Sequence, residues 1–277
     1  MASIQTYDGQ TQGYLFLMGI RPAKAIHLRE RMLLGPASCN PDPDAMIDSI
    51  MKYGSQNEID LGLLISTLRL TTAQLFIKSS DTKELAADLW NAQTDLCLIS
   101  ALLHEEIYWT VQCDVEASLF DETSSVHVVL PYRLFLPRDF AEIPLEKCLY
   151  LESVFSNASK MMSNSSFSFA VNALWSYKQN LRLSVQMAIL WAGIESLFGI
   201  RNELRFRISL LIAKFLDGGL DLYQEIKKLY DCRSSAVHNG SVSDEEVVKA
   251  TANLLHQLIL KCVDTQRMPD EKTILFR

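Results

Sequence analysis

Glycine and proline are scarce in this chain of 277 residues, which has only 11 glycines and 8 prolines. Their scarcity excludes collagen-like repeats and argues against disordered or turn-dense all-β chains. No uninterrupted apolar run reaches the roughly 20 residues that a membrane helix requires. The N-terminus also lacks the basic and apolar regions of a secretory signal. We therefore expect a helix-rich cytoplasmic protein without membrane attachment.

Motifs for metal and phosphate chemistry are absent as well. The six cysteines are widely spaced without a C-x-x-C pair, and we interpret them as buried or incidental thiols in a reducing compartment. There is no glycine-rich phosphate loop, G-x-S-x-G or H-E-x-x-H motif. His104-Glu105-Glu106 begins like the last of these, but Tyr108 stands where the second histidine would be. We predict no metal site and no cofactor.

Charge is distributed unevenly along the chain. The net charge is −7, from 26 Lys and Arg against 33 Asp and Glu, and this excludes a strongly basic nucleic-acid coat protein. Residues 1–150 carry 11 basic and 20 acidic side chains, a net of −9, whereas residues 151–277 carry 15 and 13, a net of +2. This contrast indicates that the two parts do different things.

The apolar pattern also changes along the chain. Residues 1–141 are predicted to be mixed α/β, with a helix over 81–103 and strands over 106–114 and 124–136. Residues 142–277 have a helical period and are predicted to form an all-α bundle. Its expected helices span residues 145–162, 167–179, 181–198, 202–216, 220–238 and about 244–265. The predicted fold class is α+β, with an α/β N-terminal region followed by a helical bundle.

Several local features refine this prediction. The segment 181–198 is apolar on nearly every side, which implies a central, buried helix, and Gly199 is its expected C-cap. Ser243 followed by Glu246 has the spacing of a capping box and should open the last helix. We expect the cores to contain the four tryptophans, Trp90, Trp109, Trp175 and Trp191.

The most informative segment is Tyr-Asp-Cys-Arg-Ser-Ser-Ala-Val-His-Asn-Gly, residues 230–240. It places Arg233 and His238 five positions apart near a predicted helix end. On a regular helix such a step turns the chain by ~140° net, so the two side chains would not share a face. Either the helix ends or distorts near His238, or two copies of the chain meet and each supplies both residues to a shared cleft.

This segment resembles the signature of HEPN domains, and in particular that of the Apea-like HEPN group. The shared pattern is Arg-x-x-x-x-His at the end of a helix, with a polar residue directly after the arginine. Two further segments are similar to that group: residues 190–198, an apolar helix with Glu195 near its end, and residues 203–208, the start of the next helix. The resemblance covers residues 142–277, about half of the chain.

The resemblance implies a metal-independent endoribonuclease whose site forms at a dimer interface. It assigns catalysis to Arg233 and His238, with Ser234, Asn239 and Glu195 in support. Imidazole titrates near neutral pH and can move a proton at the ribose 2′-hydroxyl or the leaving 5′-oxygen. The cationic, planar fork of arginine suits a phosphorane-like transition state.

The resemblance also implies partners and a biological setting. The partners are an RNA substrate, a second copy of the chain and a regulatory or activating protein at residues 1–141. The setting is prokaryotic antiviral defence or toxin-like growth arrest. Five basic residues form the predicted RNA-binding set, Arg201, Arg205, Arg207, Lys227 and Lys228.

Each assignment has a structural alternative. An arginine and a histidine near a helix C-terminus also stabilise the helix dipole. Glu195 could pair with Arg233 or Arg205 to position the site, or it could form a purely structural ion pair. Basic residues on helix faces are often only solvated. For the whole chain, the alternatives are a non-catalytic HEPN-like module that binds RNA or a nucleotide, and an assembly protein whose helical part only dimerises.

Overall fold

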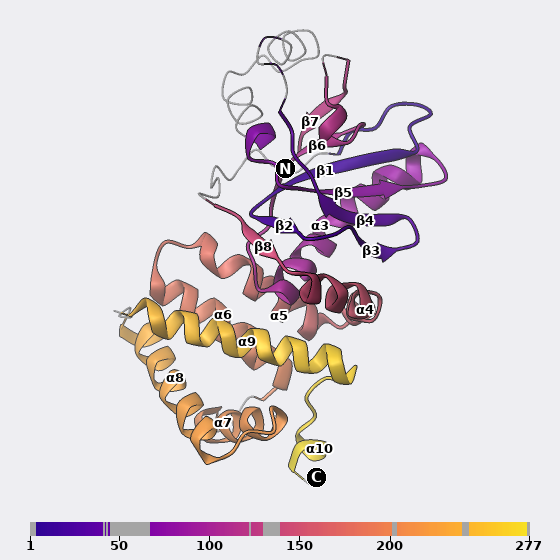
Figure 1. The fold of residues 1–277 in the computed structure, drawn as a ribbon. Helices are drawn as coiled ribbons and strands as arrows, with labels where there is room; N and C mark the ends of the chain where they lie inside the picture. Colours follow the sequence, from indigo (N-terminus) through magenta and orange to yellow (C-terminus); the bar gives the residue numbers. More distant parts are fainter. Residues whose placement is uncertain are drawn as a thin grey trace. The chain divides into compact units, whose positions relative to one another are not determined.

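The computed structural model describes residues 4–40, 42, 44, 67–121, 123–129, 139–200, 204–239 and 244–275. Contacts within the chain define two compact units, residues 1–96 with 105–155 and residues 97–104 with 156–277. The fold class is α+β, as predicted: the first unit holds an antiparallel sheet, and the second is helical (Figure 1).

A six-stranded sheet with strand order β3-β4-β5-β1-β6-β7 forms the first unit. The central strand β1 pairs antiparallel with β5 on one side and with β6 on the other. The strands are β1 (Gln12–Met18), β3 (Ile26–Arg29), β4 (Met32–Pro36), β5 (Ala73–Lys78), β6 (Tyr108–Cys113) and β7 (Val126–Val128). A short parallel pair, β2 (Ile20–Pro22) with β8 (Ala141–Ile143), completes the unit.

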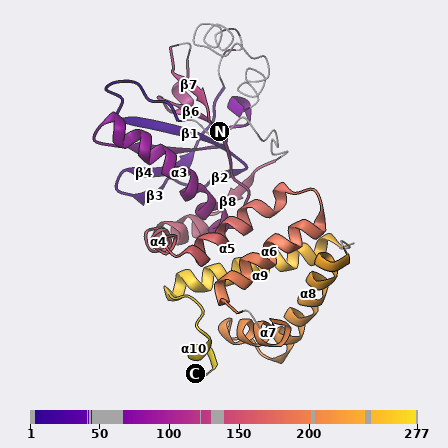
Figure 2. The same cartoon turned by 180° about the vertical axis from the view of Figure 1, so that it is seen from behind.

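Both faces of β1 are covered, which explains why its apolar residues are consecutive rather than alternating. Helix α3 (Thr82–Leu103) lies along one face of the sheet (Figure 2). Gly13 permits this approach, because a Cβ there would lie 3.1 Å from Cδ1 of Leu89. On the other face Phe16 packs in a core cluster with Cys39, Leu68, Val111, Cys113 and Ala117.

The second unit consists of helices. They include α5 (Ser165–Ser176), continued by the short η2 (Tyr177–Gln179), and then α6 (Leu183–Phe198), α7 (Leu204–Phe215), α8 (Leu220–Asn239), α9 (Glu245–Thr265) and α10 (Glu271–Leu275). The predicted boundary at residues 141/142 falls just before α4 (Leu145–Met161), whose first eleven residues belong to the first unit and the rest to the second. Among the described residues, no helix has the length and hydropathy needed to cross a bilayer.

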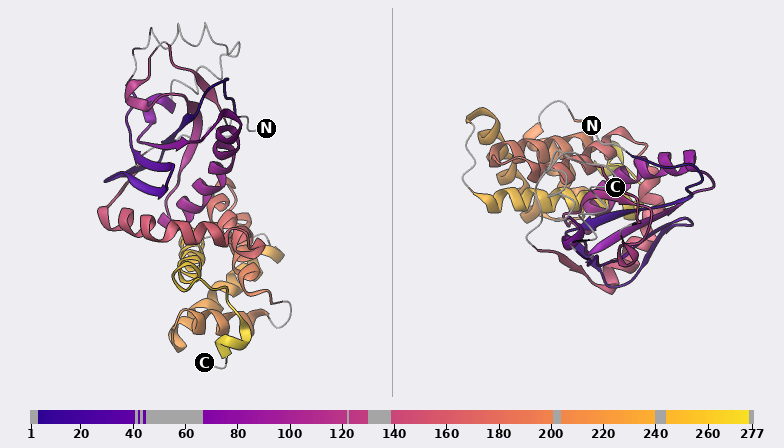
Figure 3. Two further views of the ribbon diagram at one scale, coloured as in Figure 1. Left: turned by 90° about the vertical axis from the view of Figure 1, so that its right-hand side faces the viewer. Right: turned by 90° about the horizontal axis from the view of Figure 1, so that it is seen from above.

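Helix α6 is the centre of the helical unit, as its sequence predicts. It packs against α5, α8 and α9 (Figure 3). Gly193 makes this close packing possible, since a Cβ there would lie 2.8 Å from Cβ of Ala173 and 3.0 Å from Cδ2 of Leu255. The helix ends as expected at Gly199, which adopts the left-handed conformation with φ of 63°.

The helices predicted over 81–103, 145–162 and 181–198 and the strand over 106–114 are confirmed to within a few residues. Residues 126–128 of the strand predicted over 124–136 form β7, and residues 130–138 lie outside the described part of the chain.

Two finer predictions are wrong. Trp90 is 51% exposed, because it lies about 100° around α3 from Leu89, which faces the sheet. Trp109 and Trp191 are buried as expected, and Trp175 is half-buried.

The second wrong prediction is the Ser243 cap: the N-cap of α9 is Asp244, whose carboxylate accepts a hydrogen bond from the backbone N–H of Glu246 at 2.9 Å. The short acidic side chain reaches that donor directly, so the helix begins one residue later than a Ser243 cap would place it.

Candidate functional site

The candidate site is centred on Arg233, which α8 presents to Glu195 on α6. Nη2 of Arg233 lies 3.1 Å from Oε1 and 3.4 Å from Oε2 of Glu195. The two side chains are 22% and 21% exposed, so the ion pair is largely screened from solvent. Of the two arginines that the sequence offers as partners for Glu195, the structure places Arg233 against it.

An aromatic side chain supports the same guanidinium. The Cζ of Arg233 lies 5.5 Å from the ring centroid of Tyr230, one helical turn earlier on α8. Tyr230 meets the fully buried Trp191 of α6 edge-on, with centroids 5.1 Å apart and planes at 86°. A cation over a ring that is itself fixed by an aromatic contact has little freedom to move. Arg233 is therefore positioned by a carboxylate and by an aromatic ring.

Burial dominates the electrostatics of this cluster. It raises the pKa of Glu195, and the positive charge of Arg233 opposes that rise. Burial also raises the pKa of Tyr230, with Arg233 opposing the effect and Glu195 adding to it. Nε of Arg233 and Oε1 of Glu195 are buried without an aligned hydrogen bond. The contacts to Glu195 use Nη2, so the guanidinium has N–H groups that Glu195 does not occupy.

Helix α8 continues through His238 and ends at Asn239. Because His238 still has helical backbone, it lies ~140° around the helix from Arg233. At these backbone positions the two residues do not share a face of α8, as the sequence predicts for a regular helix. Ser234 is half-buried beside Arg233, whereas the side chains of His238 and Asn239 lie outside what the structure describes.

Two of the predicted RNA-binding residues, Arg205 and Arg207, form ion pairs with carboxylates of the chain. Arg207 binds both carboxylate oxygens of Glu271, at 2.8 and 2.7 Å, and Arg205 pairs with Asp231 at 2.5 Å. Nζ of Lys227 lies 5.8 Å from the ring centroid of Tyr223, and Lys228 is exposed. Arg201 lies outside the described residues.

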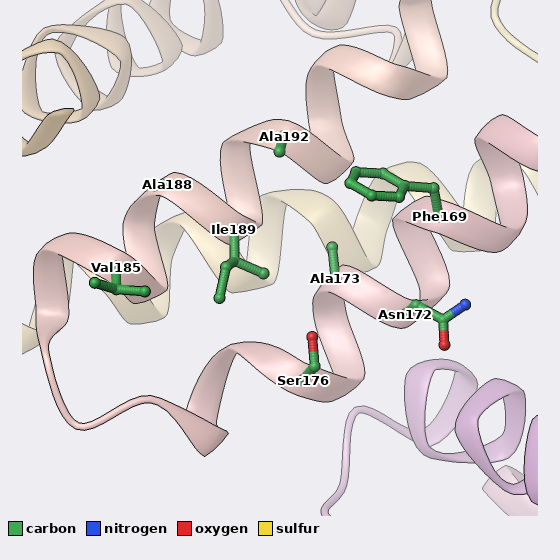
Figure 4. Close-up of a pocket in the computed structure, with 8 residues that line it drawn as sticks. All are labelled: Phe169, Asn172, Ala173, Ser176, Val185, Ala188, Ile189 and Ala192. Atoms are coloured by element: carbon green, nitrogen blue, oxygen red, sulfur yellow. The ribbon is translucent and has the colours of Figure 1, made fainter.

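A shallow groove of about 400 Å³ opens between α5 and α6 (Figure 4). None of the eight described residues that line it is ionisable. Ala192, at one end of the groove, precedes Glu195 by three residues and therefore lies close to it on the surface of α6. The lining residues are Phe169, Asn172, Ala173, Ser176, Val185, Ala188, Ile189 and Ala192.

Four other side chains that could carry chemistry are packed against neighbouring residues: His104, His256, Cys113 and Cys262. The rings of His104 and His256 stack with centroids 4.5 Å apart, and Nε2 of His256 lies 3.2 Å from the carbonyl oxygen of Leu102. Burial raises the pKa of the Cys113 and Cys262 thiols to about 12, which keeps both protonated and poorly nucleophilic. Within the described ranges, no three His, Cys, Asp or Glu side chains are grouped to hold a metal ion.

Comparison of the chain with protein-family models, with curated proteins and with solved structures gave no match. The geometry adds Tyr230 and Trp191 to the site; the sequence placed Tyr230 only within the segment 230–240 and Trp191 only in the core. A further signal for Tyr230 was spacing, since it precedes Arg233 by three positions and a helix brings such residues together.

Proposed function

We propose that the protein is a metal-independent endoribonuclease whose reaction is carried by Arg233 and His238. The observation that supports this most is the placement of Arg233. It is held by Glu195 and Tyr230, is mostly shielded from water and has N–H groups besides the Nη2 that contacts Glu195. Pre-positioned cationic donors of this kind stabilise a transition state that gains negative charge.

In the proposed reaction His238 removes the proton of a ribose 2′-hydroxyl, and the oxygen attacks the neighbouring phosphorus. Arg233 stabilises the dianionic five-coordinate transition state. The bond to the 5′-oxygen breaks, that oxygen takes up a proton from water, and the His238 imidazolium returns its proton to water; the products carry a 2′,3′-cyclic phosphate and a 5′-hydroxyl. Ser234 and Asn239 contact the phosphate or orient the imidazole. DNA resists this route because it lacks the 2′-hydroxyl.

In this proposal the complete site requires a second copy of the chain, because the positions of Arg233 and His238 are ~140° apart around α8. We place that copy on the groove between α5 and α6. Its Ala173, Ala188 and Ala192 side chains are small enough for a helix to approach closely. A copy seated there lies next to Glu195, and thus next to Arg233, which is where a shared cleft is needed.

The proposed setting follows from the same activity. Uncontrolled RNA cleavage stops growth, which fits a cytoplasmic role in prokaryotic antiviral defence or toxin-like arrest. The acidic N-terminal region, residues 1–141, binds a protein that activates or restrains the helical part.

A cleavage assay tests the proposal. Total cellular RNA is incubated with the full-length protein in the presence of EDTA. The wild type should cleave it, and His238→Ala should not. His27→Ala, which removes an exposed histidine from β3, is the matched control and should cleave normally. Equal cleavage by wild type and His238→Ala contradicts the proposal. RNA binding without cleavage by the wild type favours a non-catalytic RNA-binding module instead.

A further inference from the structure

Helices α7 and α8 present an exposed pair of aromatic rings beside a lysine. Phe206 on α7 is 58% exposed, and its ring contacts that of Tyr223 on α8, with centroids 6.4 Å apart and planes at 76°. Nζ of Lys227 lies 5.8 Å from the centroid of the Tyr223 ring. We call Phe206, Tyr223 and Lys227 the aromatic shelf. Phe206 therefore faces solvent, and its ring can stack on a ligand while the Tyr223 ring supports it from the side.

The α8 residues of the shelf lie on the same face of that helix as the position of His238. Steps of four, seven and four residues lead from Tyr223 to Lys227, Ser234 and His238, and these positions fall within ~60° around a regular helix. Along the axis, Lys227 is ~16 Å and Tyr223 ~22 Å from the backbone of His238. An extended strand following this face would therefore pass from the shelf to the proposed catalytic position.

The charge around the shelf favours a polyanion. Together α7 and α8 carry six basic residues and three acidic ones, a net of +3, in a chain whose net charge is −7. Two of the six, Arg207 and Arg233, pair with Glu271 and Glu195 on other helices, which leaves a net of +1. Arg205, next to Phe206 in the sequence, pairs with Asp231, and both side chains are about half exposed. Exposed ion pairs are weak, so a phosphate can compete for that arginine. Lysine is depleted in protein–protein interfaces, and its place against Tyr223 therefore favours nucleic acid over a protein.

We propose that the aromatic shelf binds single-stranded RNA by stacking a base on Phe206 and placing a phosphate near Lys227. This proposal rests on the ribonuclease function proposed above and supplies its substrate subsite. Stacking is tolerant of sequence because every base has a π-face. The site should accept any unpaired base and reject duplex RNA, whose bases are stacked on one another.

Fluorescence anisotropy with two labelled oligonucleotides tests the shelf. Both carry 2′-O-methyl sugars, which prevents cleavage by the proposed route, and one of them lacks bases. For the full-length protein, Phe206→Ala should weaken binding of the base-bearing strand about tenfold and leave the abasic strand nearly unaffected. Phe206→Leu should behave like the alanine variant, because it keeps apolar bulk but loses the ring. Trp90→Ala, which removes an aromatic of similar exposure from α3, is the matched control and should bind like the wild type.

Lys227→Ala should act differently from the Phe206 variants. It should weaken both oligonucleotides and reduce the slope of log K against log salt by about 0.7, the value for one phosphate contact on a single strand. Equal binding of the base-bearing strand by Phe206→Ala and wild type overturns the shelf. Equal binding of the base-bearing and abasic strands by the wild type also overturns the shelf. A Phe206→Ala variant whose only change is a different oligomeric state in light scattering overturns it as well.

The shelf and the ribonuclease can fail separately. Cleavage that depends on His238 but is indifferent to Phe206 overturns the shelf and keeps the enzyme. Base-dependent binding by a wild type that cleaves no RNA keeps the shelf and overturns the enzyme.

Discussion

Arg233 and Glu195 are 38 residues apart in the sequence and meet as an ion pair between α8 and α6, with Nη2 3.1 Å from Oε1. The pair joins the central helix of the helical unit to the helix that ends at Asn239. Removing one partner of a shielded pair leaves the other charge uncompensated. In the proposed reaction Glu195 acts through Arg233, as a positioning residue.

The first prediction concerns this positioning role. Glu195→Ala should lower kcat about 100-fold, because small displacements of a catalytic group have effects of that size, and should change KM little. Glu195→Gln keeps an oxygen that can accept from Nη2 and should recover part of the loss. Steady-state cleavage of a fluorogenic RNA measures both parameters. An alanine variant with normal kcat but a lower melting temperature would show that the pair is purely structural.

The pH dependence of stability provides a second test. Burial raises the pKa of Glu195 in the folded state, so ionising its carboxyl opposes folding. Its contribution to stability is present at low pH and is lost as pH rises through the folded-state pKa. The free energy of unfolding of Glu195→Gln, minus that of the wild type, should therefore increase between acidic and neutral pH in urea titrations. If this difference in the free energy of unfolding decreased with pH, the charge of Arg233 would lower the pKa of Glu195 by more than burial raises it.

Gly193 gives a prediction about the helical core. Valine there would collide with Ala173 and Leu255 and should lower the free energy of unfolding by about 1–3 kcal/mol, the usual cost of overpacking. Gly219→Ala is the matched control, because a Cβ at Gly219 meets nothing within 4 Å. Chemical denaturation compares the two variants. Equal stability of Gly193→Val and the wild type would contradict the close approach of α5, α6 and α9.

Arg233→Lys separates charge from geometry. The ammonium keeps the positive charge beside Glu195, so the fold should be retained. It lacks the planar donor fork, and cleavage should fall at least about 100-fold, as when a transition-state donor is removed. Initial cleavage rates, together with a circular dichroism spectrum, check both statements. A lysine variant with near-normal activity would show that only the charge matters.

The sequence predicts the helices of this fold better than its sheet. The apolar period of α6 is local information, so both its limits and its central position were predictable. The order of the sheet was not, because β1 lies between β5 and β6, and both partners are far along the chain. Trp90 shows that residue type is a weaker guide than helical position, since the apolar stripe of α3 leaves it exposed.

The candidate site was predictable in part of its residues but not in its contacts. The resemblance of residues 230–240 to a known signature pointed to Arg233 and His238, and the apolar surroundings of Glu195 meant that it needs a partner if buried. Whether that partner was Arg233 or Arg205 depended on how α6, α7 and α8 pack, which no local pattern encodes. The same packing decides that Arg205 meets Asp231 and that Phe206 meets Tyr223.

The most direct test of the central claim is cleavage of RNA by a mixture of Arg233→Ala and His238→Ala proteins in EDTA, with the product ends identified by mass spectrometry. Each variant alone should be inactive. Mixed dimers contain one shared cleft with an intact arginine from one copy and an intact histidine from the other, so the mixture should regain part of the wild-type rate and leave 2′,3′-cyclic phosphates. A mixture that stays silent while the wild type cleaves, or a variant that cleaves alone, would contradict the account.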